Sequence, residues 1–264
     1  FERHWRLGGL LFLRSFGDIA LNREANDAAA EFVRGKIREI VHDPETAEKL
    51  CPHTIIMGKR LCADSGYYET FNLPHVHLVD VKADPSNVIT ESGLRTGEDA
   101  FELDCIVFAT GFDAMTGALN RIDIRGRDGQ SLREKWSDGP RTYLGMEVAG
   151  FPNLFIVTGP GSPSVLTNML PSIEQNVNFI TDCIAYMRER ELRIIEAQQA
   201  AEDAWVAHVN AVADMTLFPD TDSWYCGANI EGKPRVFMAL IGFPEYCDKC
   251  DEVAAKGYQG FALA

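Results

Sequence analysis

The amino-acid sequence predicts an α/β fold with a parallel, Rossmann-like sheet and a helical segment in front of it. The first indication is a short apolar run, Cys105–Ala109, which follows acidic residues and ends at Thr110-Gly111. A continuous apolar run is typical of a strand covered on both faces, and a glycine at its end allows a sharp turn or a close approach to a ligand. The second indication is that strand-like and helix-like patterns alternate after residue 58.

Residues 1–57 are predicted to be helical. Asn22 precedes a segment with apolar residues at helical spacing, namely Phe32, Val33, Ile37, Ile40 and Val41. Asp43-Pro44 combines an N-cap residue with a proline at the first helical position, which predicts a short helix ending near Leu50.

Residues 58–112 are predicted to form strands and turns. Val76–Val81 has the composition of a strand, and Val88–Glu91 and Leu94–Thr96, joined by Ser92-Gly93, are typical of a hairpin. The segment would end with the buried strand Cys105–Ala109.

Residues 113–264 mix both patterns. Four more strands are expected, at Ile122–Arg125, Thr142–Val148, Asn153–Thr158 and Val236–Leu240, and a last one near Phe261. One long helix should bury a face made of Ile173, Val177, Ile180, Ile184 and Met187. A second helix should bury Trp205, Val209, Val212 and Met215, and a third should run to Lys256 and end at Gly257.

Composition excludes some partners. The chain has 264 residues, 46% of them hydrophobic, so it can bury a substantial core. Its net charge of -14 argues against nucleic acid and against an anionic membrane, because both attract a basic surface. Seven cysteines, an odd number without a disulfide pattern, fit reduced thiols, and with no secretory signal they predict a cytoplasmic protein.

Three segments could carry chemistry. Gly58-Lys59-Arg60 offers two cations for an anion, although a solvated surface pair is the commoner fate of such residues. The rigid loop Gly159–Ser164 could approach a flat cofactor or be a plain strand–helix connection. Trp224, in a polar loop, could cover a ligand or anchor a core. Cys247 and Cys250 lack the further ligands of a zinc site, so we expect no metal.

Taken together, the chain resembles the C-terminal half of the Baeyer–Villiger monooxygenases, which are class B flavin monooxygenases that include the phenylacetone and cyclohexanone enzymes. The resemblance runs along essentially the whole chain. It rests on an ordered series of segments: Phe16–Ile19, Lys59-Arg60, Tyr67–Glu69, Ala109–Ala114, Ile124–Gly126, Thr142–Gly145, Phe151–Asn153, Gly159–Pro163, Ser172–Gln175, Ser223-Trp224 and Gly227–Asn229.

The resemblance implies a two-dinucleotide-binding flavoprotein architecture and a reaction in which FAD, NADPH and O2 convert ketones to esters or lactones through a C4a-peroxyflavin. Arg60 matches the family's essential arginine, which stabilises anionic species in the active site and contacts NADP. Lys59 matches the residue that contacts the 2′-phosphate of NADPH, and Trp224 matches a tryptophan that contacts NADP. Met169 matches a residue that lies near the flavin and shapes the substrate pocket.

The sequence also departs from the family pattern. No Gly-x-Gly-x-x-Gly loop follows a strand, and the family's signature motif and the acidic partner of Arg60 are absent. We therefore expect an incomplete architecture and a piece of a longer protein. By resemblance, residues 1–57 are a helical insertion, 58–112 the C-terminal part of the NADP-binding domain and 113–264 the C-terminal part of the FAD-binding domain. An N-hydroxylating flavin monooxygenase and a non-catalytic fragment unable to hold FAD are the alternatives.

Overall fold

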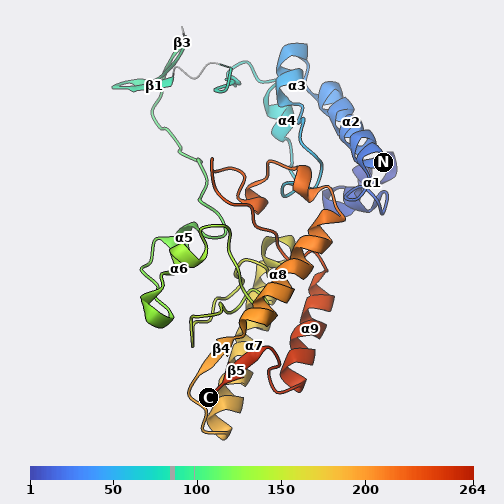
Figure 1. The fold of residues 1–264 in the computed structure, drawn as a ribbon. Helices are drawn as coiled ribbons and strands as arrows, with labels where there is room; N and C mark the ends of the chain where they lie inside the picture. Colours follow the sequence, from blue (N-terminus) through green and yellow to red (C-terminus); the bar gives the residue numbers. More distant parts are fainter. Residues whose placement is uncertain (84–86, 98) are drawn as a thin grey trace. The chain divides into compact units, whose positions relative to one another are not determined.

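The computed structural model describes residues 1–83, 87–97 and 99–264, which form two compact units (Figure 1). The first unit consists of Phe1–Ile56 and Arg60–Gly111, and the second of Met57–Lys59 and Phe112–Ala264. Within the described ranges no helix is long and apolar enough to cross a membrane.

Helices dominate the first unit, as expected for residues 1–57. They are α1 (Glu2–Leu7), the 3-10 helix η1 (Gly9–Arg14), α2 (Arg23–Ile40), α3 (Pro44–Leu50) and α4 (Tyr67–Thr70). The cap predicted at Asp43 is confirmed, because its side chain accepts from the Thr46 N–H at 2.8 Å. Asn22, which precedes the predicted longer helix, is also a cap and accepts from the Ala25 N–H at 3.0 Å. A small core of Ile37, Val41, Ala47 and Cys51 packs α2 against α3.

Three short antiparallel strands complete the first unit. They are β1 (Asn87–Thr90), β2 (Gly93–Thr96) and β3 (Asp99–Glu102), in the order β1-β2-β3. The predicted hairpin is confirmed, because Thr90 pairs with Gly93 across its turn. The strand predicted at Val76–Val81 is wrong, since these described residues form no ladder.

The buried parallel strand predicted at Cys105–Ala109 is also wrong. Residues 103–113 have no regular structure, and the side chains of Val107, Phe108 and Phe112 are 83%, 69% and 91% exposed. An apolar parallel strand needs a neighbouring strand on each side and a covering layer on each face. The described part of the chain supplies neither to this segment, so an apolar sequence with strand character stays uncovered.

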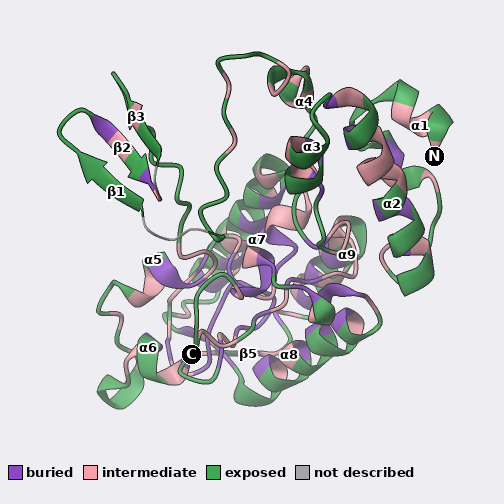
Figure 2. Ribbon diagram, turned by 90° about the horizontal axis from the view of Figure 1, so that it is seen from above, coloured by how far each residue is buried: buried purple, intermediate pink, exposed green. Residues whose placement is uncertain are grey.

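The second unit is built mainly from helices, with one large hydrophobic core and two smaller clusters. Its elements are α5 (Gly117–Asn120), η2 (Arg127–Gly129), α6 (Leu132–Lys135), η3 (Ser164–Leu166), α7 (Met169–Glu189), β4 (Ile195–Ala197), α8 (Gln199–Asp214), η4 (Phe218–Asp220), η5 (Trp224–Cys226), α9 (Phe243–Ala255) and β5 (Phe261–Leu263). Figure 2 shows that buried residues gather on α7 to α9 and on the chain between them. The predicted end of α9 before Gly257 and the last strand at Phe261 are confirmed.

The other predicted strands of this unit are wrong. In the described structure β4 pairs only with β5, antiparallel, and the segments 122–125, 142–148, 153–158 and 236–240 are not strands. Single hydrogen bonds replace a ladder, such as the 2.8 Å bond from the Ile156 N–H to the Met146 carbonyl. These segments are still core-forming, because Met146, Val148 and Ile156 are buried.

The apolar face predicted for α7 is largely on the wrong side of the helix. Ile173, Val177 and Ile184 are 37%, 44% and 44% exposed. The residues that α7 buries are Ser172, Asn176, Phe179, Cys183 and Met187. In α8 the prediction holds better, because Trp205 and Val209 are buried, although Met215 lies past the end of the helix and is exposed.

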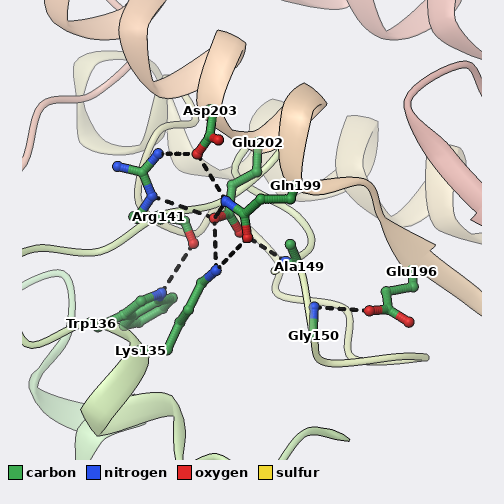
Figure 3. A network of polar contacts seen from close by, with 9 residues as sticks. All are labelled: Lys135, Trp136, Arg141, Ala149, Gly150, Glu196, Gln199, Glu202 and Asp203. Atoms are coloured by element: carbon green, nitrogen blue, oxygen red, sulfur yellow. Dashed lines mark hydrogen bonds and ion pairs between the residues drawn. The ribbon is translucent and has the colours of Figure 1, made fainter.

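A buried carboxylate ties α6 and α8 to the chain between them (Figure 3). Glu202 of α8 is fully buried, and its Oε1 lies 3.1 Å from Lys135 Nζ and 3.5 Å from Arg141 Nε. Its Oε2 accepts from the Ala149 N–H at 2.8 Å, and Arg141 also pairs with Asp203. Because both oxygens of Glu202 have partners, its burial carries a compensated charge.

Glu147 is a second buried glutamate, and unlike Glu202 it has no compensating partners for a negative charge among the described residues. Its side chain is fully buried, and neither carboxyl oxygen has a hydrogen-bond partner of good geometry among the described residues. Burial raises the pKa of Glu147 to about 8; the Ala197 backbone N–H opposes the shift and the charge of Glu196 adds to it. Glu147 is therefore protonated in the folded chain at neutral pH.

This protonation predicts that stability falls as pH rises. The folded pKa lies above the ordinary value of 4.5, so between these two values the unfolded chain loses its proton and the folded chain keeps it. The free energy of unfolding should decrease by about 1.4 kcal/mol per pH unit in this window, then level off above it. Glu147→Gln should remove this contribution and be the more stable form at alkaline pH.

Urea unfolding of the chain in dilute solution, monitored by the amount that a protease cleaves, gives the free energy of unfolding between about pH 5 and about pH 8. Glu174→Gln, on the exposed side of α7, is the matched control and should keep the pH dependence of the unchanged chain. Parallel curves for Glu147→Gln and the unchanged chain would contradict a buried neutral Glu147.

Candidate functional site

The loop Gly159–Ser164 lies directly on the turn formed by residues 143–147. Four hydrogen bonds hold its backbone to three segments of the second unit. The Gly159 N–H donates to the Gly145 carbonyl (3.1 Å), Thr142 Oγ1 to the Pro160 carbonyl (2.6 Å), Trp205 Nε1 to the Gly161 carbonyl (3.0 Å) and the Ala239 N–H to the Ser162 carbonyl (3.0 Å). Such anchoring fixes the loop more firmly than a plain strand–helix connection requires.

Glycine is required on both sides of this contact. Gly145 has a φ of 73°, and a Cβ there would lie 2.5 Å from the Cβ and N of Ser162. A Cβ on Gly159 would lie 2.6 Å from the Gly145 carbonyl oxygen. The two backbone segments therefore touch without intervening side chains.

Three residues with strained backbone lie at this contact. Leu144, Thr158 and Ser164 have φ values of 56°, 53° and 43°, in the left-handed region that side chains disfavour. Each such residue costs about 1–2 kcal/mol and persists only where its surroundings hold it. Strain of this kind is typical of ligand-binding loops, so it supports a functional role for Gly159–Ser164.

Met169 is the first residue of α7 and follows the loop closely. The Asn168 side chain caps α7 by accepting from the Leu170 N–H at 3.1 Å, and Thr167 Oγ1 lies 2.9 Å from Ser172 Oγ. Met169 itself is half-buried, so part of its side chain faces outward. Its position is thus determined by the loop before it and by the cap of α7.

Trp224 lies in η5 and is half-buried. Its ring meets that of Tyr225 edge-to-face, with centroids 4.4 Å apart, and it packs against a cluster that contains Phe218 and Met238. Val165 and Leu166, from the Gly159–Ser164 side, pack against the same cluster. The structure therefore brings Trp224 and the loop to one core, which agrees with the core-anchoring interpretation and leaves part of the indole open.

Lys59 and Arg60 are adjacent in sequence and both exposed, but they fall into different units. Lys59 groups with the second unit and Arg60 with the first. The Arg60 carbonyl accepts from Cys62 Sγ at 3.8 Å. The neighbouring Tyr67 and Tyr68 of α4 pack edge-to-face on each other, with centroids 5.2 Å apart.

Three polar residues were missed by sequence reasoning. Lys233 is nearly buried and pairs with Asp113, the residue two places after Gly111, and it also donates to the Ala114 carbonyl. Asn176 and Tyr246 contact the backbone on either side of the loop. An asparagine inside a helix was the one available signal, because such a residue favours helix ends unless its amide has a partner.

Comparison with known proteins finds relatives that match the whole of this chain. No family model matches. The chain is 45% identical over 268 residues to phenazine N-monooxygenase PhzNO1 of Lysobacter antibioticus and 44% identical over 267 residues to cyclohexanone 1,2-monooxygenase of an Acinetobacter species. Both alignments cover 100% of this chain and 49% of the relative. The chain thus spans about half the length of the curated relatives it matches.

Solved structures agree. Cyclohexanone monooxygenase from Rhodococcus sp. Phi1 bound to NADP+ has a TM-score of 0.93 at 44% identity, covering 99% of this chain and 50% of the other. The OTEMO complex with FAD and NADP has a TM-score of 0.92 at 40% identity, covering 100% and 49%. The predicted flavoprotein architecture, incomplete in this chain, is thereby confirmed. Along its whole length, this chain is similar to the C-terminal half of the flavin-dependent Baeyer–Villiger monooxygenases.

Proposed function

We propose that this chain is the C-terminal half of an NADPH- and O2-dependent monooxygenase that uses FAD to convert ketones to esters or lactones. The observation that carries the proposal is the end-to-end similarity to ketone monooxygenases, at 44% identity to cyclohexanone 1,2-monooxygenase and 43% to cyclopentanone 1,2-monooxygenase. In this proposal residues 1–57 are the helical insertion, 58–112 part of the NADP-binding domain and 113–264 part of the FAD-binding domain.

Arg60 is proposed as the catalytic residue. FAD, when bound, would supply the redox chemistry that activates oxygen. The guanidinium of Arg60 is permanently charged and exposed, and it would stabilise the negative charge that develops on the ketone oxygen. A planar group with several donors suits this task better than an ammonium, because it can contact two oxygens at once.

Lys59, Trp224 and Met169 are proposed as cofactor-binding residues. The exposed ammonium of Lys59 would pair with the 2′-phosphate of NADPH, which NADH lacks. The open part of the Trp224 ring would cover bound NADP. Met169, which is half-buried, and the fixed loop Gly159–Ser164 before it would lie against FAD.

The residues proposed here would contact the flavin ring of FAD, and the chain lacks the loop that would bind the FAD phosphates. A loop of the Gly-x-Gly-x-x-Gly type, whose N–H groups would hold the pyrophosphate, does not occur in the 264 residues. We propose that a further polypeptide half carries it and also covers the exposed apolar residues Val107, Phe108, Ile173 and Val177. A cytoplasmic location stays a prediction, supported by seven cysteines that are all free thiols in the structure.

Oxygenation of a ring nitrogen is the second candidate. One relative at 45% identity is named a phenazine N-monooxygenase, and its alignment covers the whole of this chain. FAD, when bound, would supply the oxygen-transfer chemistry for either substrate, so the residues that line the substrate pocket would decide between a ring nitrogen and a ketone. Assays with cyclic ketones and with phenazines distinguish the two functions.

We call the polypeptide in which the proposed first half precedes this chain the complete protein. In the complete protein, Arg60→Ala should reduce ester or lactone formation by about 100-fold or more. FAD should stay bound, because Arg60 is not proposed to hold it. Arg60→Lys should recover only part of the activity, since the ammonium lacks the planar fork. Product analysis by gas chromatography, with the visible flavin absorbance of each variant, measures both effects.

Lys59→Ala is the matched control at the adjacent cation. It should raise KM for NADPH by about tenfold or more, because a charge-assisted hydrogen bond is lost, and change KM for NADH little. Product yield at saturating NADPH should stay normal. Normal product formation by Arg60→Ala would refute the catalytic assignment, and equal effects of Lys59→Ala on both nucleotides would refute the phosphate contact.

A further inference from the structure

Two buried side chains from different helices meet beneath the loop Gly159–Ser164. Asn176 of α7 and Tyr246 of α9 are each 1% exposed. The Tyr246 hydroxyl donates to the Leu144 carbonyl at 2.7 Å and accepts from Asn176 Nδ2 at 3.1 Å. Asn176 Oδ1 accepts from the Thr158 N–H at 2.7 Å. We call this chain of three bonds the Asn176–Tyr246 clamp.

The clamp holds two of the strained residues described above. Leu144, with a φ of 56°, precedes Gly145 of the turn, and Thr158, with a φ of 53°, precedes Gly159 of the loop. Each of these residues gives one backbone group to the clamp. Because strained backbone persists only where its surroundings over-determine it, the clamp is the restraint that the geometry requires here.

The chemistry of the two side chains suits this purpose. A tyrosine hydroxyl donates one hydrogen bond while it accepts another, and an asparagine amide does both at separate atoms. Burial raises the pKa of Tyr246 well above its ordinary value, so its hydroxyl remains a donor. The second N–H of Asn176 donates to Gln175 Oε1 at 2.7 Å, which leaves the amide fully used.

From the clamp, contacts continue to Met169. Thr158 joins Gly159, whose N–H is bonded to Gly145, and Ser162 lies on Gly145 with no space for a side chain between them. The short helix η3 and the Asn168 cap then lead to Met169. Asn176 lies on α7 itself, two turns after Met169, so the clamp fixes the loop relative to the helix that carries this residue.

We propose that Asn176 and Tyr246 are positioning residues, which keep Leu144 and Thr158 in their left-handed conformations and thereby set the position of the Gly159–Ser164 loop and of Met169 against the flavin. The part of this inference that concerns the flavin rests on the proposed function. The part that concerns the loop rests on the contacts alone.

The test uses the complete protein and the substitution Tyr246→Phe, which deletes one hydroxyl from a buried ring. Hydrogen exchange of the Thr158 amide should accelerate by about tenfold or more, because its acceptor Asn176 loses its own anchor. The visible absorbance bands of the bound flavin should shift, since the Met169 side chain beside the flavin ring moves. Tyr258→Phe is the control: this buried tyrosine packs against Phe179 and Phe261 and should change neither signal.

A rescue variant distinguishes two reasons why Tyr246→Phe could change these signals: the strained backbone loses its restraint, or the whole core becomes looser. Glycine adopts a φ of 53° without a steric penalty, so Thr158→Gly added to Tyr246→Phe should restore much of the thermal midpoint and the flavin spectrum. If Tyr246→Phe alone does not fold, this double variant provides the comparison with Tyr258→Phe.

Two results would overturn the part of the inference that concerns the loop: equal Thr158 exchange in Tyr246→Phe and Tyr258→Phe, and no recovery of the thermal midpoint by Thr158→Gly. Faster exchange with an unchanged flavin spectrum would overturn the part that concerns the flavin. An unchanged protein that binds no flavin at all would instead refute the proposed function. In that case the exchange and rescue measurements still decide whether the clamp holds the loop.

Discussion

The second unit depends on a direct backbone contact between the turn 143–147 and the loop Gly159–Ser164. Strand ladders are scarce in the described structure. Here single hydrogen bonds replace them: Thr142, Trp205 and Ala239 donate to carbonyls of the loop, and the Gly145 carbonyl accepts from the Gly159 N–H. The contact is possible only because Gly145 and Gly159 have no side chains. Around it, α7, α8 and α9 each contribute one polar side chain that reaches into this region: Asn176, Trp205 and Tyr246.

Electrostatics reinforce this arrangement from the outer side. Glu202 collects Lys135, Arg141 and the Ala149 N–H around one buried carboxylate, so α6, α8 and the chain between them cannot separate without exposing an unpaired charge (Figure 3). Glu147 lies only two residues before Ala149, and among the described residues its carboxyl oxygens have no hydrogen-bond partner of good geometry. The same short segment thus contains a compensated buried acid and an uncompensated one.

Local signals in the sequence predicted local structure well. The cap at Asp43 and the hairpin turn at Ser92-Gly93 depend on neighbouring residues only, and the structure confirms them. Cys105–Ala109 and the Ile173–Ile184 face of α7 failed because apolar sequence indicates that a surface must be covered, but not which segment covers it. Both stay exposed here, in a chain that spans about half of its relatives' length.

The candidate site shows the same division. Resemblance named Lys59, Arg60, Met169 and Trp224, and the structure places Trp224 and the loop that precedes Met169 against one core. No periodicity marks Asn176 or Tyr246, because their partners are backbone atoms of Leu144 and Thr158, up to 102 residues away. Interactions with distant backbone atoms leave no pattern in a single sequence, so only coordinates reveal them.

The central claim is that this chain is one half of a flavoprotein whose FAD site needs the other half. The most direct measurement is the visible absorbance of the purified chain after excess FAD is added and free flavin removed, compared with the same chain co-expressed with the first half of a Baeyer–Villiger relative. The account predicts a colourless, aggregation-prone chain alone, inactive with NADPH and ketones, and bound flavin in the pair. Stoichiometric flavin on the isolated chain, with a cooperative thermal transition, would contradict it.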